Sequence, residues 1–178
     1  MSLMELSYEK QVKRAASLAI VVATVLIFIK AFAWWKTGSM AILAAMTDSL
    51  VDLFASITNV LVLRFALQPA DDNHAFGHGK AESLAALAQS AFITGSAAFL
   101  LLQGIQRLTE PQVLQSSELG IVISLISIFL TALLVWYQRK VVKATGSPAI
   151  EADSLHYQTD LYMNCLLYTS PSPRDLST

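Results

Sequence analysis

The amino-acid sequence predicts an all-α fold, a polytopic membrane helix bundle. Of its 178 residues, 54% are hydrophobic and only 14% are charged, whereas a soluble domain carries about 25% charged residues. The mean hydropathy is +0.54, and several apolar runs reach the ~20 residues that a helix needs to cross a bilayer. The composition therefore places the chain in the membrane class, and its formal net charge of -1 gives no reason to expect a nucleic-acid partner.

The apolar runs predict four complete transmembrane helices and the start of a fifth. The first span, residues 15–35, is followed by Lys36 and ends in two tryptophans that suit a membrane interface. The second, third and fourth spans are expected at residues 39–67, 81–108 and 119–137. Pro148 fits the first turn of a fifth helix, but the sequence becomes polar after Leu167, so this crossing is incomplete.

Basic residues are distributed unevenly between the two sets of segments that flank the spans. One set holds eight of them, whereas the other holds only Lys36 and Arg107. The positive-inside rule therefore predicts that the N-terminus and the loops 68–80 and 138–148 are cytoplasmic. The eight residues are Lys10, Lys13, Arg14, Arg64, Lys80, Arg139, Lys140 and Lys143.

Two carboxylates interrupt the second span. Asp48 and Asp52 are four residues apart, so a helix places them on one face. They lie roughly 13 to 20 Å beyond Ser39, near the middle of the bilayer, where each charge costs at least ~2.5 kcal/mol. A bound cation would neutralise them; a salt bridge to Lys30, or caps on neighbouring hydroxyls, would be a purely structural explanation.

The fifth helix repeats the same spacing with His156 and Asp160. Two helices that each offer ligands at positions i and i+4 can surround one ion, and three carboxylates with one imidazole suit a divalent metal, first of all Zn²⁺. The single cysteine, Cys165, excludes a cysteine-rich zinc cluster. On their own, His156 and Asp160 are equally compatible with ordinary polar residues near the start of a helix.

Asp71, His74 and His78 form a second polar cluster in the loop after the second span. Their spacing permits a metal site, but spacing alone favours a solvated loop. The third span is rich in small residues and is predicted to pack against other helices. Glu82 and Asp153 fit acidic residues near helix N-termini.

Three segments resemble the cation diffusion facilitator family. They are DSLVD at residues 48–52, QPADDNHAFGHGKAE at 68–82 and ADSLHYQTD at 152–160. The resemblance extends from about residue 8 to residue 164 and includes the linkers, so it is highly specific. It implies a transport site made of Asp48, Asp52, His156 and Asp160. It also implies a second zinc site made of Asp71, His74 and His78, which reverses the preference for a solvated loop.

The resemblance further implies a secondary active transporter and no enzyme. Members of this family are six-span homodimers that exchange cytoplasmic Zn²⁺, Cd²⁺ or Fe²⁺ for protons, and bacterial members lie in the cytoplasmic (inner) membrane. Two departures from the family follow in this chain. Residues 1–164 correspond to an incomplete transmembrane cation-efflux domain. In the family, the rest of the fifth span, a sixth span and a cytoplasmic metal-binding domain would come next, and this chain lacks them. Residues 165–178 do not resemble the family and are expected to be a disordered or artefactual tail.

Two other functions remain open from the sequence. The chain could be a non-transporting membrane fragment that only packs or dimerises, because the fifth helix is cut short and anchors His156 and Asp160 poorly. A membrane-embedded metalloenzyme has less support, since no residue is left over as a general base once the four metal ligands are assigned.

Overall fold

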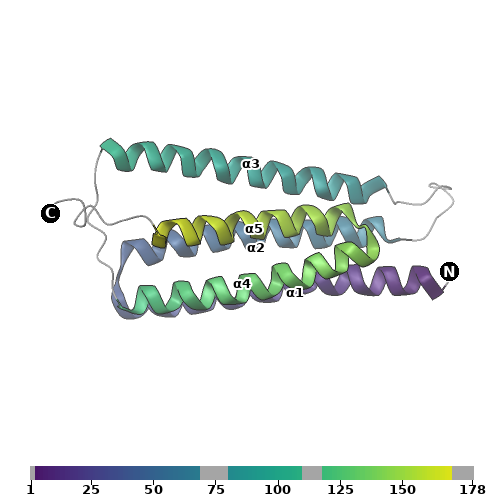
Figure 1. Ribbon diagram of the computed structural model, residues 1–178, viewed down its shortest axis with the longest axis horizontal. Coiled ribbons are helices and arrows are strands. Elements are labelled where there is room, and N and C mark those ends of the chain that lie inside the picture. Colours follow the sequence, from purple (N-terminus) through teal and green to yellow (C-terminus); the bar gives the residue numbers. More distant parts are fainter. Residues whose placement is uncertain (1–2, 69–79, 110–117, 170–178) are drawn as a thin grey trace.

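The computed structural model describes residues 3–68, 80–109 and 118–169, which contain five α-helices and no strand (Figure 1). Each predicted span corresponds to one of these helices. Their bounds are α1 (Leu3–Thr37), α2 (Met40–Ala66), α3 (Lys80–Thr109), α4 (Glu118–Thr145) and α5 (Pro148–Thr169). Helix α5 continues through residues 165–169 of the expected tail, and residues 170–178 lie outside the described part of the chain.

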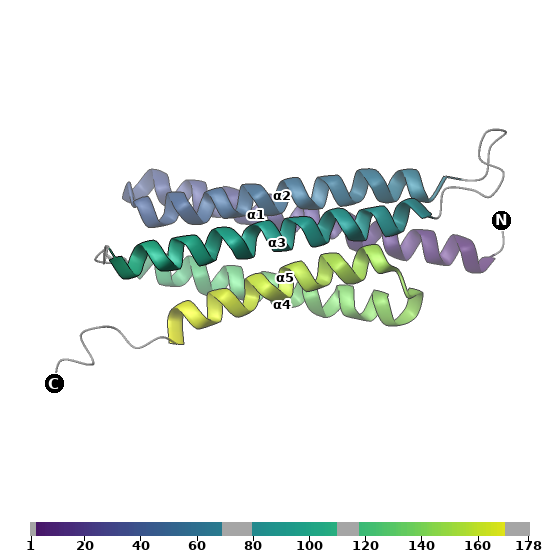
Figure 2. The ribbon, with the colours of Figure 1, turned by 90° about the horizontal axis from the view of Figure 1, so that it is seen from above.

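The helices form an elongated bundle in which successive helices run in opposite directions (Figures 1 and 2). Around the bundle the order of contacts is α1, α2, α3, α5 and α4, and α4 closes the ring against α1. Helix α5 also contacts α1 and α2 across the bundle. This topology places α5 beside α2, so the two helices that carry the predicted ligands are neighbours although about a hundred residues separate them.

The two short connections, between α1 and α2 and between α4 and α5, use the same three residues, Thr-Gly-Ser. The glycines, Gly38 and Gly146, have φ angles of 63° and 66°, a left-handed conformation that other residues adopt only with strain. The amide of Gly146 donates to the carbonyl of Val142 at 2.7 Å, and that of Gly38 donates to Trp34 at 2.7 Å. Each bond ends the preceding helix with a single left-handed residue.

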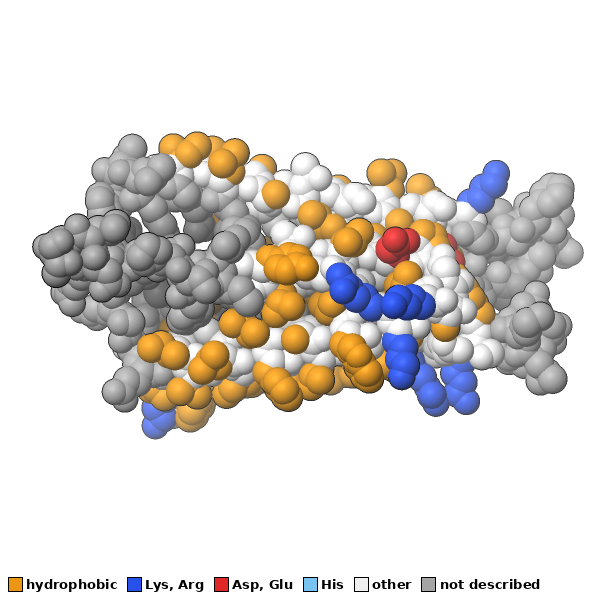
Figure 3. Space-filling view, in the orientation of Figure 1, with side chains coloured by type: hydrophobic (Ala, Val, Ile, Leu, Met, Phe, Trp, Pro, Cys, Tyr) orange, Lys and Arg blue, Asp and Glu red, His pale blue; other side chains and the backbone are white. Residues whose placement is uncertain are grey.

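The interior of the bundle contains many small and polar side chains beside a few large apolar ones such as Leu63 and Leu134, whereas most large apolar side chains point outward. Helix α1 buries a stripe of alanines that includes Ala15, Ala19 and Ala23, which allows close helix approach. The outward positions are strongly exposed, for example 73% for Trp35 and 70% for Phe28. Such extensive exposure of large apolar side chains is unusual for a soluble protein and is expected where lipid surrounds the helices. Apolar side chains cover much of the face in Figure 3.

Three of the described helices are long and apolar enough to cross a membrane. These candidate spans are Ser7–Thr37, Ile42–Ala66 and Leu119–Thr145. The five expected helices are present, but the expected number of four complete spans and the start of a fifth is not confirmed. Helix α3 exists as expected over Lys80–Thr109, and most of the side chains in its last third lie outside the described residues. Helix α5 carries several polar and acidic residues, so it is less apolar than the three candidate spans.

We predict that Gly146→Ala lowers the free energy of unfolding by about 1–2 kcal/mol, because alanine must adopt the left-handed conformation of the α4–α5 turn. A β-carbon at this position meets no atom within 4 Å, so a steric clash does not contribute. Gly95→Ala is the matched control, since Gly95 lies within α3 and is equally open. It is expected to raise the stability by up to ~1 kcal/mol. Chemical denaturation in detergent measures both changes, and equal effects would contradict the prediction.

Candidate metal centre

Helix α2 directs a polar stripe into the bundle. Asp52, Ser56 and Asn59 follow one another at helical spacing, and Ser56 and Asn59 are 1% and 2% exposed. Asp52 lies about 18 Å along a helix that is about 40 Å long, so it sits near the middle of the candidate span. The stripe faces α5, from which His156 and Asp160 extend toward it.

Asp52, His156 and Asp160 converge. Nε2 of His156 lies 3.3 Å from Oδ1 of Asp52 and 3.6 Å from Oδ2 of Asp160. One potential ligand atom from each residue lies within 4.8 Å of the other two. In a tetrahedral zinc site with bonds of ~2.0–2.1 Å, neighbouring ligand atoms are roughly 3.3–3.5 Å apart. The two distances from His156 are therefore close to those that a shared metal ion requires.

The histidine nitrogen between the two carboxylates has no satisfactory hydrogen bond. Within the described residues, Nε2 of His156 is buried and makes no hydrogen bond of acceptable geometry, although both carboxylates are near. Buried polar atoms are nearly always paired, so such an exception needs an explanation. A cation held jointly by the three side chains would supply the missing interaction.

Asp48 does not join this group. It is exposed, and the three converging residues do not include it. Asp48 lies one helical turn, about 6 Å, from Asp52 along α2, and its side chain is exposed at that level. The structure thus brings together three of the four predicted transport ligands. The loop residues Asp71, His74 and His78 lie outside the described residues.

Lys30 of α1 extends toward α2. Its ammonium donates to the carbonyl of Ala45 at 3.0 Å and to the hydroxyl of Ser49 at 2.6 Å. Among the described residues, it forms no ion pair with Asp48 or Asp52. A salt bridge to Lys30 therefore does not account for the two acids of α2.

Buried hydrogen bonds fix the rotation of α5 about its axis. Asp153, which is fully buried, accepts hydrogen bonds from Nε2 of Gln89 in α3 at 3.1 Å and from Nε2 of Gln138 in α4 at 2.5 Å. On the same helix, the Tyr157 hydroxyl shares a hydrogen bond of 2.7 Å with Ser56 of α2. Three neighbouring helices thereby hold the turns that carry His156.

Sequence reasoning missed this role of Asp153. Asp153 was expected only as an acid near the N-terminus of a helix; it lies in the second turn of α5, and the acid of the first turn is Glu151. Glu82 does lie in the first turn of α3. It also accepts hydrogen bonds from Ser147 and from Tyr8, whose hydroxyl is 2.8 Å from Oε2. The signal that could have identified Asp153 is an acidic residue on the same helix face as Tyr157, with glutamines in two other apolar helices.

Comparison with known proteins shows which family the chain resembles. The family described as "Cation efflux transmembrane domain" matches residues 16–170. The chain is 59% identical over 161 residues to the cation-efflux pump FieF of Klebsiella pneumoniae (strain 342) and to that of Yersinia enterocolitica. It is 56% identical over the same length to that of Escherichia coli O1:K1. Each alignment covers 90% of this chain and 54% of the relative, so the chain spans about half the length of these relatives.

Family membership follows from the extent of these matches. The matched segment, residues 16–170, contains both Asp52 and the His156–Asp160 turn. The resemblance to cation diffusion facilitators in the sequence is thereby confirmed, and the membrane-spanning helices identify an integral membrane protein with the character of a transporter. The chain belongs to the cation efflux family.

Proposed function

We propose that this protein exports divalent metal cations from the cytoplasm, with Asp52, His156 and Asp160 as the centre of its transport site. The observation that carries the proposal is the convergence of these three side chains from α2 and α5 inside a membrane bundle. Relatives that share more than half of the aligned residues are named cation-efflux pumps. The metal is the cargo of the protein, and no general base is needed for its passage.

The chemistry of the site favours Zn²⁺, with Cd²⁺ and Fe²⁺ as further substrates. Carboxylate oxygens and an imidazole nitrogen suit borderline divalent metals. We assign Asp48 as the fourth ligand, which a modest rotation of α2 would bring toward the other three. Asp71, His74 and His78 are proposed as a second zinc site in the loop between α2 and α3.

We further propose that the protein is a metal/proton antiporter. A metal binds only to neutral imidazole and ionised carboxylates, so loading the site releases protons and protonation expels the metal. Imidazole has an ordinary pKa of ~6.5, which makes His156 the natural group for exchange near neutral pH. Competition of one metal ion and protons for the same ligands is enough to couple their opposite movements.

The arrangement in the membrane is proposed from the distribution of basic residues. They gather mainly toward the end of the bundle that holds the N-terminus (Figure 3), which favours a cytoplasmic N-terminus in the inner membrane of a bacterium. Helix α3 and the start of α5 are proposed as further membrane segments beside the three candidate spans. Residues 1–164 then form the transmembrane domain, residues 165–178 a separate tail, and two copies a homodimer.

The competing hypothesis is a membrane fragment that packs or dimerises without transport. The observation that favours it is that the converging group holds Asp52, His156 and Asp160 without Asp48, the fourth predicted ligand. Titration calorimetry of the purified chain with Zn²⁺ separates the two hypotheses. Stoichiometric binding supports an assembled site, whereas the absence of binding supports the fragment.

We expect His156→Ala and Asp52→Ala each to weaken zinc binding more than about 100-fold, because each removes one of three converging ligands and even supporting residues contribute 10–100-fold. Calorimetry on the chain measures binding, and zinc flux into proteoliposomes measures transport. Glu151→Ala is the control, since this exposed acid lies on the same helix outside the cluster. Unchanged binding in both ligand variants would refute the site.

For Asp48→Ala we expect a smaller loss of zinc affinity, about tenfold or more, with residual binding by the other three residues. The same calorimetric titration measures it. An affinity equal to that of the unaltered chain would show that Asp48 is not a ligand, while leaving the three-residue site in place.

Zinc affinity should fall as the pH is lowered from 7.5 to 5.5. Below the pKa of imidazole each bound metal displaces a proton from His156, so the dissociation constant rises up to about tenfold per pH unit. Calorimetry in buffers of different ionisation enthalpy counts the released protons directly. A pH-independent affinity with no proton release would contradict the proposed exchange.

A further inference from the structure

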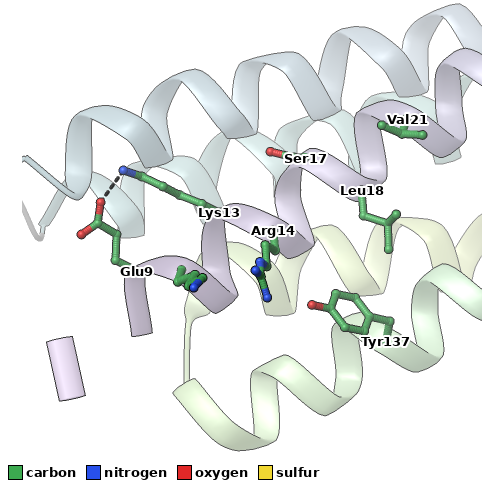
Figure 4. A pocket seen from close by; sticks show the side chains of 8 residues that line it. Glu9, Lys13, Arg14, Ser17, Leu18, Val21 and Tyr137 are labelled. Atoms are coloured by element: carbon green, nitrogen blue, oxygen red, sulfur yellow. Dashed lines mark hydrogen bonds and ion pairs between the residues drawn. The ribbon is translucent and has the colours of Figure 1, made fainter. Parts of the chain in front are cut away.

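An open pocket of about 770 Å³ lies between α1 and α4, near the N-terminal end of α1 (Figure 4). It is separate from the metal centre, because none of the three converging ligands lines it. Most of its wall comes from α1, and Tyr137 of α4 forms the opposite side. The proposed transport function does not make use of this pocket.

The wall from α1 changes in character along the helix. Lys10 and Arg14 come first, one turn apart, followed by Ser17 and then by the apolar residues Leu18 and Val21. The distance along the helix from Lys10 to Val21 is about 16 Å. A ligand that lies along this wall therefore meets positive charge at one end and hydrocarbon at the other.

The charge of the pocket is positive. Its one acid, Glu9, is paired with Lys13 on the same helix, which neutralises both (Figure 4). Lys10 and Arg14 are exposed and have no ion pair with any residue that the structure describes. Two cations are thus available to an anionic ligand at the mouth of the pocket.

Aromatic and basic residues place the pocket at the level of the lipid headgroups. On α4, the ammonium of Lys140 lies 5.1 Å from the ring centre of Trp136, the neighbour of Tyr137. At the other end of α1, Lys36 lies 5.2 Å from the ring centre of Trp35. Such pairs are typical of the two membrane interfaces. The basic part of the pocket is therefore at an interface, and its apolar part extends into the hydrocarbon.

We propose that this pocket binds one anionic phospholipid. The phosphate lies against Lys10 and Arg14, the glycerol region lies near Ser17, and an acyl chain lies against Leu18 and Val21. Basic pockets between transmembrane helices bind anionic headgroups in this way. The apolar wall favours a lipid over a free phosphate ion, which would leave Leu18 and Val21 uncovered.

Native mass spectrometry of the purified chain, titrated with phosphatidylglycerol or phosphatidylcholine of identical acyl chains, tests the proposal without any substitution. One molecule of phosphatidylglycerol should bind at least about tenfold more tightly than phosphatidylcholine. Equal binding of the two lipids would overturn the proposal. Displacement of the lipid by glycerol 3-phosphate at similar concentration would also overturn it, because the pocket would then be a site for a free phosphate.

Two variants locate the site. The double variant K10Q/R14Q should weaken phosphatidylglycerol binding roughly tenfold to thirtyfold, from two lost basic contacts. K80Q/K143Q is the matched control, because it removes two exposed charges outside the pocket and should have little effect. Leu18→Trp keeps the charge but fills the apolar part, so it should weaken binding about as much as K10Q/R14Q. An equal loss in the control pair, or no loss in Leu18→Trp, would contradict a defined pocket, and circular dichroism verifies that each variant retains its helices.

Discussion

The structure depends on the requirement that polar groups inside a membrane bundle find partners within the protein. Lipid offers no hydrogen bonds, so each unsatisfied group costs several kcal/mol. The bundle meets much of this requirement by connecting polar side chains between helices, as in the hydrogen bonds from Gln89 and Gln138 to Asp153. The buried amide of Asn59 is an exception, since it makes no hydrogen bond of acceptable geometry among the described residues. Since hydrophobic burial contributes little to helix association in lipid, hydrogen bonds between helices and the close packing of alanines hold the helices together.

The same bonds determine where the proposed metal ligands lie. Asp153 and Tyr157 fix α5 against three other helices, and His156 lies between them in sequence. Because α5 is held by hydrogen bonds before and after His156, it cannot rotate freely about its axis at that residue. The imidazole is therefore presented to Asp52 in one orientation, and the site inherits its geometry from residues that do not bind the metal.

Much of the fold and part of the site could be predicted from the sequence, for identifiable reasons. Apolar runs and tight turns are local features, so every helix was expected near its observed position. Asp52 was recognisable because charge in an apolar helix is rare. His156 and Asp160 were recognisable because they repeat the four-residue spacing of Asp48 and Asp52 and lie in a segment that resembles the family. The position of Asp48 and the hydrogen bonds of Lys30 and Asp153 depend on how neighbouring helices are rotated relative to each other. This rotation cannot be predicted from the sequence of one segment alone.

The exposure of the three proposed ligands favours a site for cargo over a structural ion pair. His156 is 1% exposed, whereas the side chains of Asp52 and Asp160 are 20% and 27% exposed. A structural pair gains most when both partners are buried and well bonded, yet Nε2 of His156 lacks a good hydrogen bond among the described residues. Carboxylates that stay partly accessible to solvent can exchange a cation for water or protons at a modest cost in free energy. A firmly held imidazole beside two accessible carboxylates thus suits an ion that must bind and leave.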